Sequence, residues 1–236
     1  MAPLIVHHLN NSRSQRILWL LEELNVNYEI KHYKRGPDRR APKSLRDVHP
    51  LGKSPLITTE EGRVIAESGT ICEYIIKRYA PSPEAYRSSL KEGWIDDSYW
   101  SQFAEASFMP AAVMKLVFTI VPTQSPFLVR PLVSAICNGV ITGFVDPELA
   151  KLLSFASGEL KAKGGQWFAG GDAEGNPTLA DFQMLFPVEA AVYGGRMPAS
   201  FSFEGDGRVV KEWIEKVHAR PAYKRALEKG GPYDYA

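Results

Sequence analysis

Two serines near the N-terminus, Ser12 and Ser14, flank an arginine just before an apolar run that reads ILWLLEEL. Ser12 precedes Arg16 by four residues and lies at the end of a loop that leads into a predicted helix. A hydroxyl in that position can donate a hydrogen bond to an anion, while the helix N-terminus adds its positive field. Ser14 falls inside the first helical turn, where we expect a structural role. The side-chain amide of Asn11 is the alternative donor.

A second candidate site is the segment HPLGKSPL at 49–56. The pair Ser54-Pro55, placed where a strand opens, is a candidate for a cis peptide bond. Such a turn would leave the backbone N–H and C=O of Ser54 free to bind an extended, peptide-like ligand, in the way that an added strand is bound. Lys53 could meet a carboxylate of the same ligand. The alternative is an ordinary turn without a ligand.

The pair Glu67-Ser68 comes immediately before the third predicted helix. The free N–H groups and partial positive charge at a helix N-terminus suit a carboxylate. Glu67 could hold an ammonium group of the same ligand, so the pair fits the head group of an α-amino acid. Ser68 is also expected to be the N-cap of this helix, a role that needs no ligand.

A cluster of basic residues follows the second predicted strand: Lys34, Arg35, Arg39, Arg40, Lys43 and Arg46. The proline and glycine residues of 34–52 predict a loop there, with at most one short helix. Such a cluster is usually a solvated loop. Its functional alternative is the attraction of a small anionic ligand, and the sequence leaves both open.

Other patterns that carry chemistry are absent from the sequence. The string GKS at 52–54 is not a phosphate-binding loop, because Asp47 occupies the position where that pattern requires glycine. No G-x-S-x-G elbow of a serine hydrolase occurs. The five histidines form no short-spaced ligand set, and His7 and His8, adjacent on a strand, point to opposite faces. We therefore expect no metal site.

The first third of the chain alternates strand and helix patterns, and these elements must position the candidate residues. The β-rich runs predict four strands: 4–8, 28–33, 55–59 and 63–66. Apolar residues recur on one helical face at 17–24, and SGTICEYIIKRY at 68–79 predicts a further helix. The order βαβ followed by ββα predicts a small α/β domain at 1–80.

Beyond a proline- and serine-rich segment the patterns become helical. We predict a linker at 81–90 and an all-helical domain at 91–236. The segments predicted to be helical are 94–118, 127–163, 178–192 and 209–217. Four large side chains of the first segment could line an apolar pocket, although such residues at helical spacing are more often core. They are Trp100, Phe103, Phe108 and Met109.

The composition is that of an ordinary soluble protein: of 236 residues, 44% are hydrophobic and 23% are charged. The formal net charge of +1 favours neither nucleic acid nor an anionic membrane as partner. Cys72 and Cys137 form no disulfide or zinc pattern, so we expect buried thiols in a reducing compartment. No signal peptide is evident, and the longest apolar stretch, 132–145, is shorter than the roughly 18 residues of a membrane span. A cytoplasmic protein is expected.

Four motifs together resemble the cytosolic glutathione transferases. They are S-x-x-x-R at 12–16, HPLGKSPLI at 49–57, ESGTICEYI at 67–75 and NPTLADF at 176–182. Each motif alone is weak, but they follow the family's order and span both predicted domains. In the fourth, Thr178 and Asp181 have the spacing of the capping box with which the family starts its central helix. The run HHLNNSRSQRILWLLEEL is most similar to a fungal and bacterial subgroup of serine-type transferases.

The resemblance implies a thioredoxin-like first domain and a role for each candidate residue. Ser12 matches the serine that donates to the glutathione sulfur, with Asn11 as its rival. Ser54 matches the backbone clamp on the cysteinyl unit, and Pro55 matches the cis-proline. The residues that match the contacts to the γ-glutamyl head and the glycyl carboxylate are Glu67, Ser68 and Lys53.

The resemblance further implies an enzyme that activates the glutathione thiol as a thiolate for attack on apolar electrophiles. Glutathione is then a co-substrate, and no cofactor or metal is expected. Reduction of organic hydroperoxides is a further implied activity, detoxification the implied role, and a homodimer the implied assembly. In that dimer the first domain of one subunit meets the helical domain of the other. The alternatives are a non-catalytic carrier that uses the same fold and an interaction protein that binds no glutathione.

Overall fold

A four-stranded sheet in the order β2-β1-β3-β4 forms the centre of the first domain. The computed structural model describes residues 2–205 and 207–236. Its strands are β1 (Leu4–Leu9), β2 (Tyr28–Tyr33), β3 (Leu56–Thr58) and β4 (Val64–Ala66). The pair β1/β2 is parallel, whereas β1/β3 and β3/β4 are antiparallel. The four predicted strands and the βαβ-ββα order are confirmed.

Three helices belong to this domain: α1 (Ser14–Glu23), α2 (Ser44–Val48) and α3 (Ser68–Tyr79). The first buries the predicted apolar face, since Ile17, Leu20 and Leu21 are fully enclosed. The short α2 lies within 34–52, where a loop with at most one short helix was predicted. Because β1 pairs with β3 through His7 and Leu56, the β1–α1 loop lies beside the turn that precedes β3.

The start of α3 differs from the expectation that Ser68 is its N-cap. The N-cap is Glu67, which has a φ of 70° and makes no side-chain capping hydrogen bond, while Ser68 is already the first helical residue. An N-cap needs a non-helical backbone, and the turn at Glu67 supplies it one residue earlier than predicted. The first N–H groups of α3 therefore stay without an intrahelical partner.

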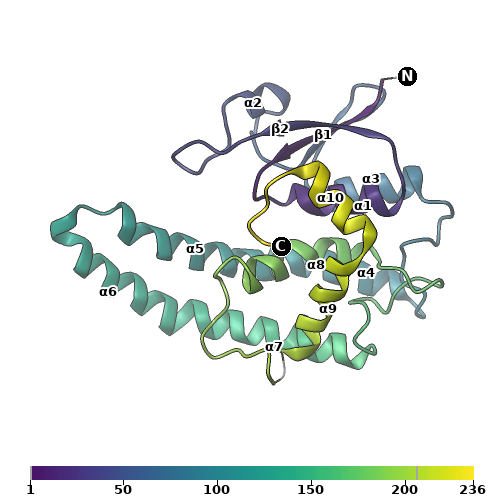
Figure 1. Cartoon of the computed structure of the whole chain (residues 1–236). Helices are drawn as coiled ribbons and strands as arrows, with labels where there is room; N and C mark the ends of the chain where they lie inside the picture. The colour runs from purple at the N-terminus through teal and green to yellow at the C-terminus, as the bar shows by residue number, and fades with distance from the viewer. Residues whose placement is uncertain (1, 206) are drawn as a thin grey trace.

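The rest of the chain is helical, and no helix or strand lies between Tyr79 and Gly93, all of whose residues are described. The elements are α4 (Gly93–Gln102), η1 (Phe103–Phe108), α5 (Met109–Gln124), η2 (Phe127–Val129), α6 (Arg130–Val140), η3 (Ile141–Val145), α7 (Asp146–Ala162), α8 (Leu179–Val192), α9 (Arg208–Ala219) and α10 (Pro221–Gly230). All four predicted helical segments are present. Helix α10 was not predicted from the sequence. It packs against α1 and β2, so the chain returns to the first domain (Figure 1).

The central helix α8 begins with the predicted capping box. The Thr178 side chain accepts from the backbone at Asp181, and the Asp181 carboxylate accepts from the backbone N–H of Thr178. Asp181 also accepts from the indole N–H of Trp213 at 3.0 Å. The carboxylate thus ties α8 to α9 in the core. The aromatic residues Trp100, Phe103 and Phe108 and the side chain of Met109 are buried there, so their core interpretation is confirmed.

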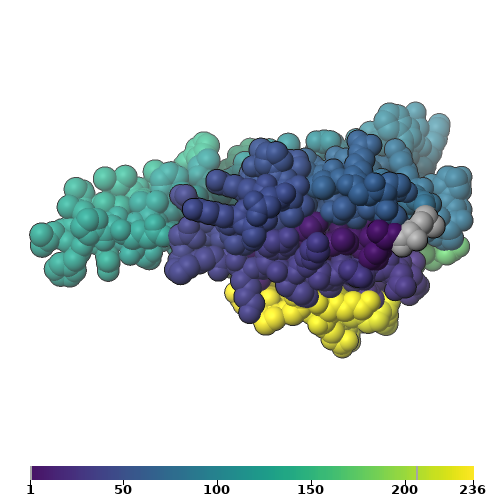
Figure 2. Space-filling model, turned by 90° about the horizontal axis from the view of Figure 1, so that it is seen from above, coloured from purple at the N-terminus to yellow at the C-terminus, as the bar shows by residue number. Residues whose placement is uncertain are grey.

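Two long helical stretches form a hairpin that extends beyond the body of the molecule (Figures 1 and 2). They run from Gly93 to Gln124 and from Phe127 to Ala162, and by length and composition alone each could cross a membrane. Core helices of soluble proteins can have the same length and apolar composition. From the sequence, the apolar stretch 132–145 was expected to be too short for a membrane span. In the structure it forms part of the longer helical stretch Phe127–Ala162, and Asn138 lies inside α6. At the tip, Phe127 and Leu128 are 80% and 88% exposed.

Candidate active site

The β1–α1 loop places Ser12 directly in front of the N-terminus of α1. Its side chain is buried, with 5% of the residue exposed. The Ser12 hydroxyl accepts from the backbone N–H of Ser14 at 3.2 Å and lies 3.3 Å from the hydroxyl of Ser54. Ser12 therefore connects the helix N-terminus with the turn before β3, and its hydroxyl is polarised by a helical N–H group.

Ser14 is held by a buried network. Its hydroxyl lies 2.9 Å from Nδ1 of His8 and 2.8 Å from the hydroxyl of Ser12, and it donates to the carbonyl of Leu9. Burial, assisted by the nearby charge of His32, lowers the pKa of His8 to about 4, so its ring is neutral at pH 7. These contacts fit the structural role expected for Ser14. They also fix the orientation of the loop that carries Ser12.

Asn11 has different surroundings from its neighbour. It adopts a left-handed backbone with a φ of 50°, which asparagine tolerates better than most residues. Its amide nitrogen donates to the Asp234 carboxylate at 2.6 Å, and its side-chain oxygen accepts from the backbone N–H of Asp234 at 2.9 Å. The C-terminal segment thus holds the Asn11 side chain. The predicted ligand contact of Asn11 stays a prediction.

The turn before β3 has the predicted backbone, because the Ser54-Pro55 peptide bond is cis. The Ser54 hydroxyl donates to the carbonyl of His7. Among the described residues nothing hydrogen-bonds to the backbone N–H or C=O of Ser54. Both groups are therefore available to an extended ligand, as the sequence predicted.

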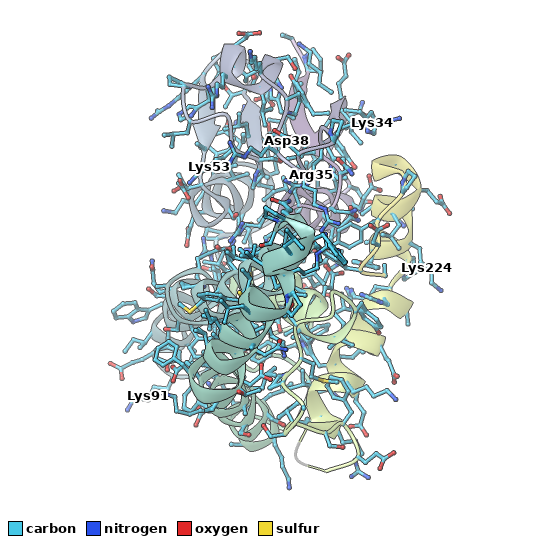
Figure 3. All side chains as sticks on the ribbon, turned by 90° about the vertical axis from the view of Figure 1, so that its left-hand side faces the viewer. Lys34, Arg35, Asp38, Lys53, Lys91 and Lys224 are labelled. Carbon is cyan, nitrogen blue, oxygen red and sulfur yellow. The ribbon has the colours of Figure 1, made fainter. Side chains whose placement is uncertain are left out.

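Five predicted site residues line one cavity of about 190 Å³: Lys53, Ser54, Pro55, Glu67 and Ser68. The cavity lies where the turn before β3 meets the N-terminus of α3. Lys53 is exposed and lies on the other side of the first domain from Lys34 (Figure 3). Ser12 and Asn11 do not line the cavity, but Ser12 reaches its edge through Ser54. The structure brings six of the seven candidates together, and Asn11 faces the C-terminal segment.

Two further residues, Arg13 and Glu105, line the cavity and were not predicted from the sequence. The Glu105 carboxylate accepts from Nε of Arg13 at 2.9 Å and from Nη1 of the buried Arg16 at 2.8 Å. Burial opposes ionisation of Glu105, but the two guanidinium charges outweigh it, and its pKa lies below the usual value. The same Arg16 nitrogen donates to Gln183 on α8. This network fixes α1 against the helical domain, and contacts between such distant positions leave no pattern in the sequence.

A larger groove of about 1170 Å³ runs between α3 and α4 and shares Glu67, Ser68 and Glu105 with the smaller cavity. The exposed Trp94 lies on its α4 wall. The groove continues from the candidate site toward the outer surface of the molecule. It offers a surface for a further molecule next to the site.

Neither of the two cysteines lies at the surface. Burial raises the pKa of the Cys72 thiol to about 12, so this thiol is not a nucleophile at neutral pH. Cys137 is also buried, and both cysteines are free, as predicted. Within the described part of the chain no three His, Cys, Asp or Glu side chains gather in a way that could hold a metal ion.

Comparison with known proteins gives a consistent result. Residues 3–77 match the family model "Glutathione S-transferase, N-terminal domain". Glutathione S-transferase 3 of Schizosaccharomyces pombe is 34% identical over 228 residues, which cover 96% of this chain and 87% of that protein. Glutathione S-transferase 1 of Saccharomyces cerevisiae is 28% identical, with coverages of 96% and 95%. A crystal structure of a glutathione S-transferase from Actinobacillus pleuropneumoniae superposes with a TM-score of 0.73 at 24% identity, covering 98% of this chain and 95% of that chain.

Proposed function

The chain belongs to the glutathione transferase family, and from this premise we propose that Ser12 holds the sulfur of bound glutathione as a thiolate. The observation that carries the proposal is the position of the Ser12 hydroxyl. It lies between the N-terminus of α1 and Ser54, whose free backbone groups suit a peptide-like ligand. Ser12 acts here as a hydrogen-bond donor to an anion. The nucleophile is the sulfur of the co-substrate.

Such a site can supply the free energy that is needed to lower the pKa of the glutathione thiol. A thiol with a pKa of about 8.5 is only about 3% ionised at pH 7, and lowering the pKa by about 2 units makes the thiolate the major form. That shift corresponds to about 2.7 kcal/mol. A hydrogen bond to a charged group contributes about 1.5–3 kcal/mol, and the helix N-terminus adds its field.

The other cavity residues suit the remaining groups of glutathione. The turn at Glu67 leaves the first N–H groups of α3 open to the γ-glutamyl carboxylate, and the Glu67 side chain suits the ammonium group. Ser54 offers its backbone to the cysteinyl unit, beside Pro55. Lys53, exposed and without an acidic partner among the described residues, suits the glycyl carboxylate.

The reaction proposed is conjugation of glutathione to electrophiles, with reduction of organic hydroperoxides as a further activity of the same thiolate. We place this activity in the cytoplasm, in the detoxification of reactive compounds. The functional unit proposed is a homodimer. The sequence alternative, a carrier that binds glutathione without turnover, would have no need of a hydroxyl at the thiol position.

Turnover of 1-chloro-2,4-dinitrobenzene by the wild type and by Ser12→Ala tests the proposal. We expect kcat/KM to fall about 10- to 100-fold in the variant, the loss that one charge-assisted hydrogen bond implies. Glutathione binding, measured by calorimetry, should persist in Ser12→Ala, because the peptide contacts remain. Binding without turnover of several electrophiles by the wild type would favour the carrier, and failure to bind glutathione would favour an interaction protein.

A further inference from the structure

A buried arginine without a counter-ion lies beside the candidate site. Arg196, in the loop that follows α8, is 4% exposed, and its Nε and Nη1 atoms have no hydrogen-bond partner in the described part of the chain. Its third nitrogen, Nη2, donates to the phenol oxygen of Tyr235 at 3.1 Å. Arginine stays protonated in proteins, so this side chain cannot avoid the cost of burial by losing its proton.

A second arginine from the basic cluster faces the same region. Among the described residues, the Arg35 side chain donates only to backbone carbonyls, those of Asn10, Arg39 and Asn11. In Figure 3, Arg35 lies inward of Lys34, which is at the outer edge of the first domain. Burial lowers the pKa of both side chains, and the charge of Arg196 lowers the pKa of Arg35 further.

Acidic groups that could neutralise this pair are engaged elsewhere. No carboxylate of the described residues lies within 4.0 Å of a side-chain nitrogen of Arg35 or Arg196. Asp234, from the neighbouring C-terminal segment, accepts from Asn11, and Glu105 accepts from Arg13. Burying a charge without a partner costs several kcal/mol, so an anion that fills this position gains affinity from the unpaired donors.

The position of this pair relates it to the thiol site. Arg35 donates from Nη2 to the carbonyl of Asn11, the residue that precedes Ser12. Arg196 packs against the ring of Tyr235, which in turn contacts Phe186. An anionic group held by the two guanidinium groups would therefore lie next to the loop that carries Asn11 and Ser12. The rings of Tyr235 and Phe186 beside it suit the apolar part of the same ligand.

We propose that Arg196 and Arg35 bind a carboxylate of the acceptor, so that the enzyme selects electrophiles that combine an apolar body with a carboxylate. This inference rests on the proposed function and narrows its substrate class from apolar electrophiles to anionic ones. A guanidinium N–H forms a charge-assisted hydrogen bond with a carboxylate, and Arg196 has free donors on Nε and Nη1.

A matched pair of aryl chlorides provides the test: 4-chloro-3,5-dinitrobenzoate and its methyl ester. In both, the glutathione thiolate attacks the carbon that bears chlorine, a C–S bond forms, the C–Cl bond breaks and chloride leaves with its electron pair. Each kcat/KM is divided by the uncatalysed rate constant with glutathione at the same pH. We expect the wild type to prefer the benzoate over the ester by at least about tenfold.

Arg196→Gln and Arg35→Gln should each lower this preference about tenfold or more. Arg208→Gln is the matched control, because Arg208 is exposed on α9 and pairs with Glu212 on the same helix. It should keep the wild-type preference. Equal preference in the wild type and Arg196→Gln would overturn the proposal.

A binding measurement tests the anion site independently of turnover and shows whether each variant is folded. The unreactive 3,5-dinitrobenzoate should raise the melting temperature of the wild type, and its methyl ester should not. Arg196→Gln should itself melt no lower than the wild type, because it removes an unpaired buried charge, and it should lose the response to the benzoate. Equal effects of benzoate and ester would contradict the anion site. Turnover of neither chloride would instead contradict the proposed transferase function, while the melting response would still decide the anion site.

Discussion

Ser12 and Asn11 are adjacent polar residues whose side chains have different hydrogen-bond partners. The Ser12 hydroxyl faces the turn at Ser54, whereas the Asn11 amide is bound on both its nitrogen and its oxygen by Asp234. Either donor must give up a hydrogen bond to serve a thiolate, since the Ser12 hydroxyl also lies 2.8 Å from that of Ser14. Only Ser12, however, lies beside the turn whose backbone N–H and C=O are free. The geometry therefore favours Ser12 as the thiolate donor.

The two residues can be separated by substitution. Asn11→Gly keeps the left-handed backbone, which glycine adopts without strain, and removes only the amide. We expect it to reduce kcat/KM with 1-chloro-2,4-dinitrobenzene by less than about fivefold, against about 10- to 100-fold for Ser12→Ala. The measurement is steady-state kinetics of both variants at pH 6.5 and 7.5. A larger loss in Asn11→Gly than in Ser12→Ala would assign the thiolate to Asn11.

At the scale of the elements, sequence patterns predicted the helices and strands that are determined by residues close to one another in the chain. The apolar face of α1 follows from Ile17, Leu20 and Leu21, and the capping box of α8 follows from the spacing of Thr178 and Asp181. The start of α3 shifted by one residue because a left-handed backbone at Glu67, unusual for a glutamate, left no sign in the sequence.

The candidate site could be predicted where it is built from short segments, and not where distant side chains meet. The cis turn and the α3 N-terminus carry their ligand groups on the backbone, so residue type and neighbours sufficed. Glu105 joins the site through Arg16, far away in sequence, and Arg196, in the loop after α8, contacts Tyr235 near the C-terminus. Helix α10 was missed as well, because its contacts with α1 depend on ion pairs such as Glu22 with Arg225.

The capping box makes the stability of the helical domain dependent on pH. Burial, with a contribution from the charge of Asp97, raises the pKa of Asp181 to about 6 from an ordinary value of 3.8, although three hydrogen bonds oppose the shift. The folded protein therefore keeps a proton that the unfolded chain releases between about pH 4 and 6. The stabilisation is fully present below the ordinary pKa and is lost as the pH rises through 6.

Asp181→Asn tests this dependence, because asparagine keeps the shape without the titration. We expect the free energy of unfolding of the wild type, relative to the variant, to fall as the pH rises from 4 to 7, by up to about 3 kcal/mol. Urea unfolding at each pH measures it, with the exposed Glu215→Gln as control. The variant should be less stable throughout, since its amide cannot accept all the hydrogen bonds that Asp181 accepts. A pH-independent difference would contradict the raised pKa.

At the scale of the whole molecule, the helical hairpin exposes a row of large apolar side chains. Leu128, Leu132, Ile136 and Phe144 follow one another at intervals of four or eight on the second stretch, and all are more than half exposed. Between Lys115 and Asp146, which pair with each other, the only charged residue is Arg130. Monomeric proteins rarely expose contiguous apolar patches above a few hundred Å². The proposed homodimer supplies a second copy of the chain as the molecule that covers this surface.

Sedimentation at micromolar concentration tests the dimer, and we expect a species of twice the 26.3 kDa of the chain. The double variant Leu132→Glu, Ile136→Glu should shift it toward the monomer, because an interface core that must bury two unpaired charges loses several kcal/mol. Lys211→Glu, on the exposed face of α9, is the matched control and should leave the dimer intact. A dimer that survives the double variant would place the contact in the groove between α3 and α4. A wild type that sediments as a monomer would contradict the dimer, and flotation of that monomer with phosphatidylcholine vesicles would assign the apolar hairpin to a lipid surface.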